Sequence, residues 1–141
     1  NKDAGFFFFF QLGESIKNAE LFQNIDFLVP IPLHPKKEHI RGYNQSHVIA
    51  QGVEDKTNIP IAKDCLIRKV FTSTQTKKSR EERWENVKDI FEIKDSKYYE
   101  SKHILLIDDV LTTGATLLAA GRTLSQVLDI KISAATAACT S

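Results

Sequence analysis

At 141 residues, the chain has the length of one ordinary domain and can bury a sizeable hydrophobic core. Its hydrophobic content of 42% and charged content of 26% are typical of a soluble globular protein, and a formal net charge of +1 gives no general attraction to nucleic acid or to membranes. The two cysteines, Cys65 and Cys139, form neither a disulfide framework nor a zinc-binding spacing. We therefore expect reduced thiols in a cytoplasmic protein, and no metal site built from side chains alone.

The first residues raise the question of what lies upstream. The sequence contains no Met and begins at Asn1, so we interpret it as part of a longer protein. The apolar run Phe6 to Phe10 is too short to span a bilayer, which takes about 20 residues, and it lacks the flanks of a signal peptide. Its spacing with Leu12 and Ile16 fits one broad helix face, so we predict a helix over residues 3–19, with a surface for a partner as the alternative.

The next segment combines a short strand with basic residues. Residues 27–29 predict a buried strand that ends at Pro30 and Pro32, because proline fixes φ and removes a hydrogen-bond donor. A basic loop follows over residues 34–41, and its place beyond the carboxyl end of a strand favours anion binding. Asn44 or Ser46 then caps a predicted helix.

The middle of the chain predicts two strands on either side of a polar loop. Residues 65–71 form the first strand and residues 89–93 the second, which alternates and is expected to be antiparallel or at an edge. The tail 72–80 has no apolar residue, so we expect a mobile flap there. Arg80 and Arg83 follow with a spacing of three, which places them on one face of a helical turn.

Residues 104–116 organise the rest of the chain. Residues 104–107 are an unbroken apolar run, which predicts a strand buried on both faces, and Asp108 and Asp109 follow at its end. Small and hydroxylated residues around Gly114 lead into a helical pattern that continues to Leu128. The N-terminus of a helix offers free N–H groups to a phosphate, whereas the two carboxylates suit sugar hydroxyls or Mg²⁺. An ordinary strand-to-helix turn capped by Thr is the alternative.

Two common nucleotide motifs are absent. No Lys follows Gly114, so the turn is not a P-loop, and the dinucleotide-binding pattern of three glycines is missing. With a final strand of small residues at 131–139, the order of elements predicts an α/β fold with a mainly parallel, twisted sheet flanked by helices. The whole chain is expected to form a single domain.

Three separated stretches resemble the ComF family of competence proteins, relatives of the type I phosphoribosyltransferases. They are residues 29–34 with 41–46; Arg68, Thr74, Gln75, Arg80, Arg83, Asn86, Val87 and Phe91; and residues 104–116, which resemble a loop that binds phosphoribosyl pyrophosphate (PRPP). The resemblance covers essentially the whole chain and implies the type I phosphoribosyltransferase fold with its flexible flap. Family members usually carry an N-terminal zinc ribbon of four cysteines, which this chain lacks, so zinc and the partners of the ribbon lie beyond what it can show.

The resemblance implies displacement of pyrophosphate from PRPP through a transition state like an oxocarbenium ion. The 5′-phosphate is assigned to residues 112–116 and the ribose hydroxyls to the acidic pair, whereas Mg²⁺ is expected to be bound mainly through PRPP itself. The residues expected to bind PRPP are Asp108, Asp109, Leu111, Thr112, Thr113, Gly114, Ala115 and Thr116. Those expected to face pyrophosphate are Lys36, Lys37 and Arg41. The expected catalytic cations are Lys77, Lys78, Arg80 and Arg83, on a flap that closes over the ligand.

The resemblance implies neither a particular acceptor nor that the protein is an active enzyme. Purine-salvage relatives place an Asp where this chain has Thr112, and Thr is no comparable base near pH 7, so an amine-type acceptor fits better. The rival reading is a non-enzymatic PRPP- or nucleotide-binding accessory protein of DNA uptake. A general nucleic-acid binder is a weaker third reading, because only Trp84 supplies an aromatic residue near the basic flap and Glu81, Glu82 and Glu85 dilute its charge. Nucleic acid is a partner only under these last two readings. A homodimer is a further option, and no membrane is expected.

Overall fold

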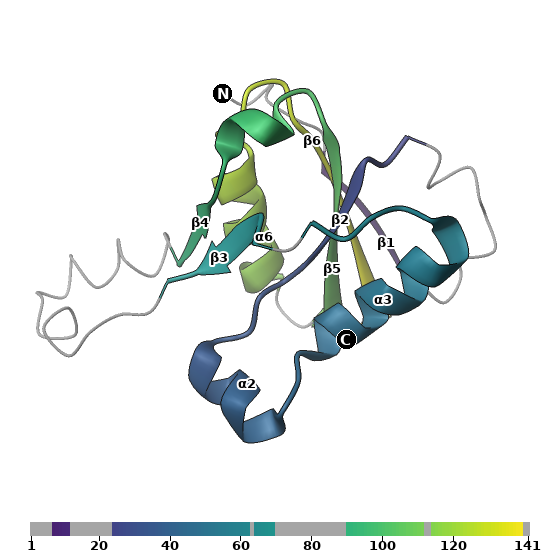
Figure 1. Cartoon of the computed structure of the whole chain (residues 1–141), viewed down its shortest axis with the longest axis vertical. Helices are drawn as coiled ribbons and strands as arrows, with labels where there is room; N and C mark the ends of the chain where they lie inside the picture. Colours follow the sequence, from purple (N-terminus) through teal and green to yellow (C-terminus); the bar gives the residue numbers. More distant parts are fainter. Residues whose placement is uncertain (1–6, 12–23, 63, 70–89, 112–113, 140–141) are drawn as a thin grey trace, which may run out of the picture.

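The computed structural model describes residues 7–11, 24–62, 64–69, 90–111 and 114–139 (Figure 1). Its main sheet has four parallel strands in the order β1-β6-β5-β2. They are β1 (Phe7–Gln11), β2 (Phe27–Pro30), β5 (His103–Leu111) and β6 (Lys131–Cys139). A parallel bridge between Leu28 and Ile61 extends the sheet beyond β2. The predicted α/β class with a mainly parallel sheet is thus confirmed.

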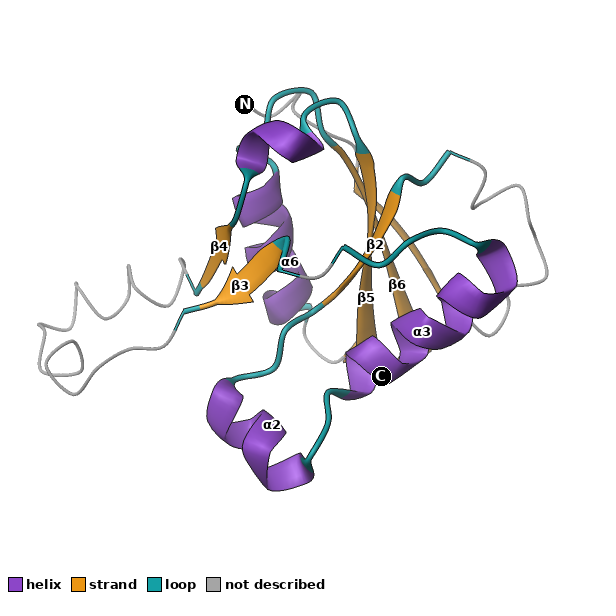
Figure 2. Cartoon of the chain, in the orientation of Figure 1, coloured by secondary structure: helices purple, strands orange, loops and turns teal. Residues whose placement is uncertain are grey.

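Helices cover both faces of this sheet (Figure 2). On one face α6 (Ala115–Leu124) packs Leu117 and Leu124 against Ile104 and Leu106 of β5. On the other, α3 (Gln45–Thr57) packs Ala50 and Val53 against Leu105 and Ile107. Successive strand residues point to opposite faces, so a strand covered on both sides must be apolar at every position. This explains the unbroken run Ile104 to Ile107, whose four side chains are fully buried.

A second sheet has two antiparallel strands, β3 (Leu66–Arg68) and β4 (Phe91–Ile93). Phe91 joins the core on the α6 side, and the Arg68 guanidinium lies 5.7 Å from the centre of its ring. The short 3₁₀ helix η2 (Ser96–Tyr99) follows, and Tyr99 covers the buried thiol of Cys65. Burial raises the pKa of that thiol to about 12, so Cys65 is an inert packing residue.

The prediction of a helix over residues 3–19 was wrong where the structure describes it. Residues Phe7–Gln11 are strand β1, which pairs in parallel with β6, Phe7 opposite Ile132. A short apolar run satisfies both a helix face and a buried strand, and here pairing with the open edge of β6 decides between them. The rest of the predicted helix lies outside the described residues.

Three other elements differ from expectation in their bounds. The basic residues 34–41, expected as a loop, form helix α2 (Pro35–Arg41), because Pro35 suits the first helical turn and the His34 ring accepts the Lys36 N–H at 3.1 Å. Strand β5 continues through Asp108 and Asp109 to Leu111, so the acidic pair lies within the strand end. Helix α6 ends at Leu124, four residues before the end of the helical pattern.

Two buried hydroxyl groups on β6, those of Ser133 and Thr136, offer a test of this core. Thr136 is fully buried, and its hydroxyl has no hydrogen-bond partner among the described residues. Thr136→Val should therefore raise the free energy of unfolding by about 1 kcal/mol, because an unpaired buried hydroxyl is removed without changing the shape of the side chain.

The matched control is Ser133→Ala on the same strand. The Ser133 hydroxyl lies 2.7 Å from Nε2 of His103, so its loss should destabilise by about 1 kcal/mol. Urea unfolding of both variants measures the difference, and a loss of stability in Thr136→Val would show that its hydroxyl is paired.

Candidate functional site

The candidate site lies at the edge where parallel strands β2 and β5 end. The backbone continues the ladder past β2, since the Ile31 N–H donates to the Ile107 carbonyl at 2.8 Å. Asp108 and Asp109 follow on β5, and α6 starts just beyond. In open α/β sheets ligands bind at this edge, so the fold places the predicted PRPP residues where a ligand is expected.

Asp108 is half-buried and fixed at one oxygen. Its Oδ1 accepts the Asp109 N–H at 2.9 Å and the Ser46 hydroxyl at 3.3 Å. Burial, and then the neighbouring Asp109 carboxylate, raise the pKa of Asp108 to about 6, while the Asp109 N–H and the Ser46 hydroxyl work in the opposite direction. The charged form of this carboxylate is therefore poorly solvated without a ligand and would gain from hydroxyl donors.

The Asp109 carboxylate also accepts a hydrogen bond from the backbone of the residue that follows it. Its Oδ1 accepts the Val110 N–H at 2.9 Å, and Val110 itself is exposed. Each carboxylate is thus oriented by the backbone N–H of the next residue. Because the two groups are neighbours in the chain, forming such a bond costs little conformational entropy. The two carboxylates belong to adjacent residues and together offer several acceptor oxygens, which suits a molecule with neighbouring hydroxyl groups.

The start of α3 joins this edge through two polar residues. The side-chain Oδ1 of Asn44 caps the helix by accepting the Ser46 N–H at 3.0 Å, and the side-chain Nδ2 of Asn44 donates to the Ile31 carbonyl at 3.1 Å. Asn44 therefore ties the segment after β2 to the helix whose Ser46 reaches Asp108. The sequence indicated that Asn44 or Ser46 would cap a helix, but the contact with Asp108 spans 62 residues and has no local signal.

The predicted phosphate turn is described at its end. Gly114 is in the left-handed region with φ of 81°, and its carbonyl accepts the Leu118 N–H at 2.9 Å. Gly114 has no side chain with which to cap α6. Thr116 is half-buried in the first turn and Ala115 is exposed. Leu111 ends β5, whereas Thr112 and Thr113 lie outside the described residues.

The predicted pyrophosphate residues lie together on α2. Lys36, Lys37 and Arg41 are all exposed, and no residue of this helix is buried. Gly42 ends the helix with φ of 83°, two residues before Asn44. The cations are thus on the same chain segment that Asn44 ties to the strand edge, without an ion pair to the acidic pair among the described residues. Figure 1 shows α2 standing out from the sheet.

The four predicted catalytic cations, Lys77, Lys78, Arg80 and Arg83, lie outside the described residues. The structure does show where their segment starts and ends. Among the described residues on either side of it, the Lys69 N–H donates to the Ile90 carbonyl at 2.8 Å, which continues the pairing of β3 and β4. The segment is therefore a connection between two antiparallel strands, as the sequence predicted.

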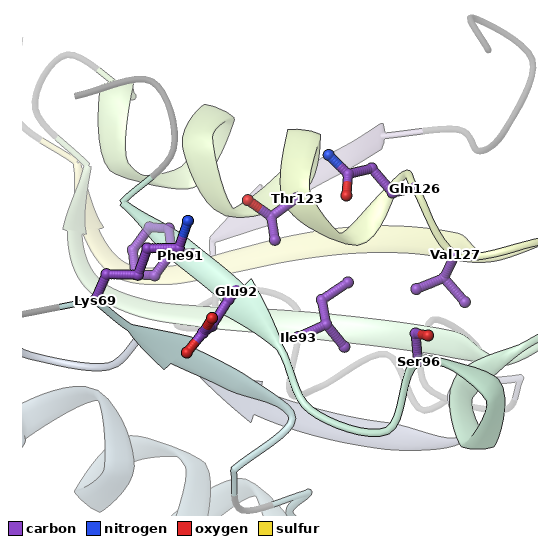
Figure 3. A pocket seen from close by; sticks show the side chains of 8 residues that line it. All are labelled: Lys69, Phe91, Glu92, Ile93, Ser96, Thr123, Gln126 and Val127. Atoms are coloured by element: carbon purple, nitrogen blue, oxygen red, sulfur yellow. The ribbon is translucent and has the colours of Figure 1, made fainter. Parts of the chain in front are cut away.

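A pocket of about 400 Å³ lies elsewhere, between β4, η2 and the end of α6 (Figure 3). Its lining comprises Lys69, Phe91, Glu92, Ile93, Ser96, Thr123, Gln126 and Val127. None of the predicted site residues lines it, and it faces the opposite end of α6 from Gly114, so we do not place the function there. No cluster of three His, Cys, Asp or Glu residues occurs in the described ranges. None of their helices is long and apolar enough to cross a bilayer.

Comparison with known proteins identifies the family. The profile of the phosphoribosyl transferase domain matches residues 44–138, which is most of the chain and includes the acidic pair and the start of α3. The chain belongs to the phosphoribosyltransferase domain family. The resemblance to the ComF family, within the type I phosphoribosyltransferase superfamily, is also confirmed by the relatives.

Two competence proteins and a DNA utilization protein are among these relatives. Competence protein ComFC of Bacillus subtilis is 41% identical over 97 residues, 69% of this chain and 37% of its own length. Competence protein F of Haemophilus influenzae is 34% identical over 91 residues, covering 64% and 40%. DNA utilization protein YhgH of Escherichia coli is 29% identical over 92 residues, covering 65% and 40%. The chain thus spans about two fifths of the length of these relatives.

The raised pKa of Asp108 predicts a dependence of stability on pH. Between the ordinary value of 3.8 and about 6, the folded chain binds more protons than the unfolded chain, so the free energy of unfolding falls as pH rises through this window. Asp108→Asn removes the effect. After allowance for solvent screening of a half-exposed group, it should stabilise the protein by about 1 kcal/mol at pH 8, and the gain should vanish near pH 4.

Urea unfolding at several pH values between 4 and 8 measures this difference, with Asp55→Asn as the control. Asp55 is an exposed carboxylate on α3, so its replacement should change the free energy of unfolding little. A gain for Asp108→Asn that does not depend on pH would contradict the assigned burial of its charge.

Proposed function

We propose that this protein binds PRPP and transfers its phosphoribosyl group to an amine-type acceptor, with release of pyrophosphate. In this reaction the bond from the anomeric carbon to pyrophosphate breaks, a carbon–nitrogen bond forms, and the amine loses a proton. One observation carries the proposal: a pair of carboxylates at the end of a buried parallel strand, immediately before a helix that starts at a left-handed glycine, in a phosphoribosyltransferase domain.

The acidic pair suits the ribose better than a phosphate. Asp108 and Asp109 would repel a phosphate placed against them, but their oxygens can accept the hydroxyls of a sugar. The phosphate then belongs a few residues further on, where α6 begins with N–H groups and a positive dipole end. The spacing along the chain thus follows the order of groups along a ribose 5-phosphate.

Cations are needed where charge develops. Negative charge builds on pyrophosphate as the bond breaks, and fixed positive groups there lower the barrier. Helix α2 is exposed and carries three positively charged side chains that can turn toward a ligand, Lys36, Lys37 and Arg41. The proposed cations of the flap are Lys77, Lys78, Arg80 and Arg83. Mg²⁺, held mainly by the oxygens of PRPP, would supply further positive charge when it is bound.

The alternative proposal is a PRPP- or nucleotide-binding accessory protein of DNA uptake. It is favoured by the names of three relatives, two competence proteins and a DNA utilization protein. Such a protein would keep the ligand site and lack turnover, since a fold does not fix an activity. Both proposals place the protein in the cytoplasm, where a buried thiol such as Cys65 stays reduced.

Binding is tested by unfolding with and without PRPP and Mg²⁺. At a ligand concentration of one hundred times Kd, the free energy of unfolding should rise by about 2.7 kcal/mol, because only the folded chain binds. Asp108→Asn combined with Asp109→Asn should lose most of this gain, whereas exposed Asp129→Asn should keep it. No stabilisation of the parent chain at millimolar PRPP would remove both proposals.

Turnover separates the two proposals. Arg80→Gln with Arg83→Gln should reduce pyrophosphate release at least tenfold and change the Kd of PRPP by much less, since the charge on pyrophosphate peaks in the transition state. Arg122→Gln, at an exposed position on α6, is the matched control. Binding of PRPP without pyrophosphate release to any amine acceptor tried would favour the accessory protein.

A further inference from the structure

Ser46 is an unusual member of the strand edge. It is the second residue of α3 and only 4% exposed, yet its side chain is polar. Its hydroxyl donates to Oδ1 of Asp108 at 3.3 Å, and its backbone N–H is held by the Asn44 cap. The Asn44 side chain also bonds the Ile31 carbonyl, so it links the backbone of Ser46 to the backbone that follows β2. This link fixes the place from which the Ser46 hydroxyl reaches Asp108.

The two oxygens of Asp108 have different surroundings. Oδ1 accepts two donors, the Asp109 N–H and the Ser46 hydroxyl. No hydrogen bond to Oδ2 occurs among the described residues. A carboxylate held at one oxygen has a fixed plane, so the directions in which Oδ2 can accept a hydrogen bond are fixed as well.

We propose that Ser46 is a positioning residue, which holds Oδ1 of Asp108 so that Oδ2 accepts a ribose hydroxyl. This role rests on the proposed binding of PRPP and deepens it, since it makes the first turn of α3 part of the sugar site. Ser46 does not need to touch the ligand. It acts on the ribose through Asp108.

The charge balance of the site explains why such a residue is needed. Burial and the Asp109 carboxylate both disfavour the charged form of Asp108, and that form accepts hydroxyls best. The Ser46 hydroxyl and the positive N-terminal end of α3 oppose this effect. The bond is long for a hydroxyl donor.

The test compares ligands with and without the sugar. Ser46→Ala should weaken binding of ribose 5-phosphate roughly three- to tenfold, the value of one hydrogen bond, and leave binding of pyrophosphate unchanged. Ser46→Thr, which keeps the hydroxyl, should restore most of the affinity. Thr57→Val is the matched control, because that hydroxyl donates within the same helix, to the Val53 carbonyl at 2.7 Å. An equal loss for both ligands in Ser46→Ala would show a merely structural role.

A titration without any ligand separates this proposal from the proposed function. In Ser46→Ala the pKa of the Asp108 carboxyl, followed by ¹³C NMR, should rise by roughly half a unit to one unit, because a donor to the charged form is lost. An unchanged titration would overturn the positioning role. If the shift appears but the parent chain binds no ribose 5-phosphate, the proposed function fails and the role toward ribose fails with it, while the contact to Asp108 stands.

Discussion

The burial of strand β5 on both faces is the constraint on which the rest of the structure depends. Residues Ile104 to Ile107 have no solvent-exposed side, since α6 covers one face and α3 the other. A charge within this run would be desolvated without a partner, so Asp108 is the first position at which the strand can carry one. The acidic pair therefore stands at the carboxyl edge, where the strand leaves the core and where the loops of neighbouring strands meet.

The two covering helices do more than bury the strand. Helix α6 starts just past the acidic pair, and its N-terminus faces the same edge with Gly114 as its cap. Helix α3 reaches the edge from the other side of the sheet, with Asn44 and Ser46 in its first turn. The packing that stabilises the fold thus also brings the carboxylates and the first turns of both helices to this edge of the sheet.

Much of this arrangement could be predicted from the sequence because it is local. The apolar run, the acids after it and the helical spacing after Gly114 are contiguous, so each could be interpreted from its immediate neighbours in the chain. Residues Phe7–Gln11 were predicted wrongly because the apolar run Phe6 to Phe10 has no period of its own, and their strand depends on a partner, β6, more than a hundred residues away. The Ser46 contact with Asp108 was missed for the same reason, as nothing near Ser46 in the chain specifies it. Basic residues 34–41 lack a buried face, so no hydrophobic periodicity predicted their helix and they were predicted as a loop.

An experimental structure of the protein with PRPP and Mg²⁺ tests the central claim most directly. The account predicts the ribose hydroxyls within hydrogen-bonding distance of the Asp108 and Asp109 carboxylates, with Oδ2 of Asp108 as an acceptor. It also predicts the 5′-phosphate at residues 112–116, against the N-terminus of α6. PRPP bound in the pocket between β4 and α6, or at the sheet edge with its ribose away from both carboxylates, would contradict it.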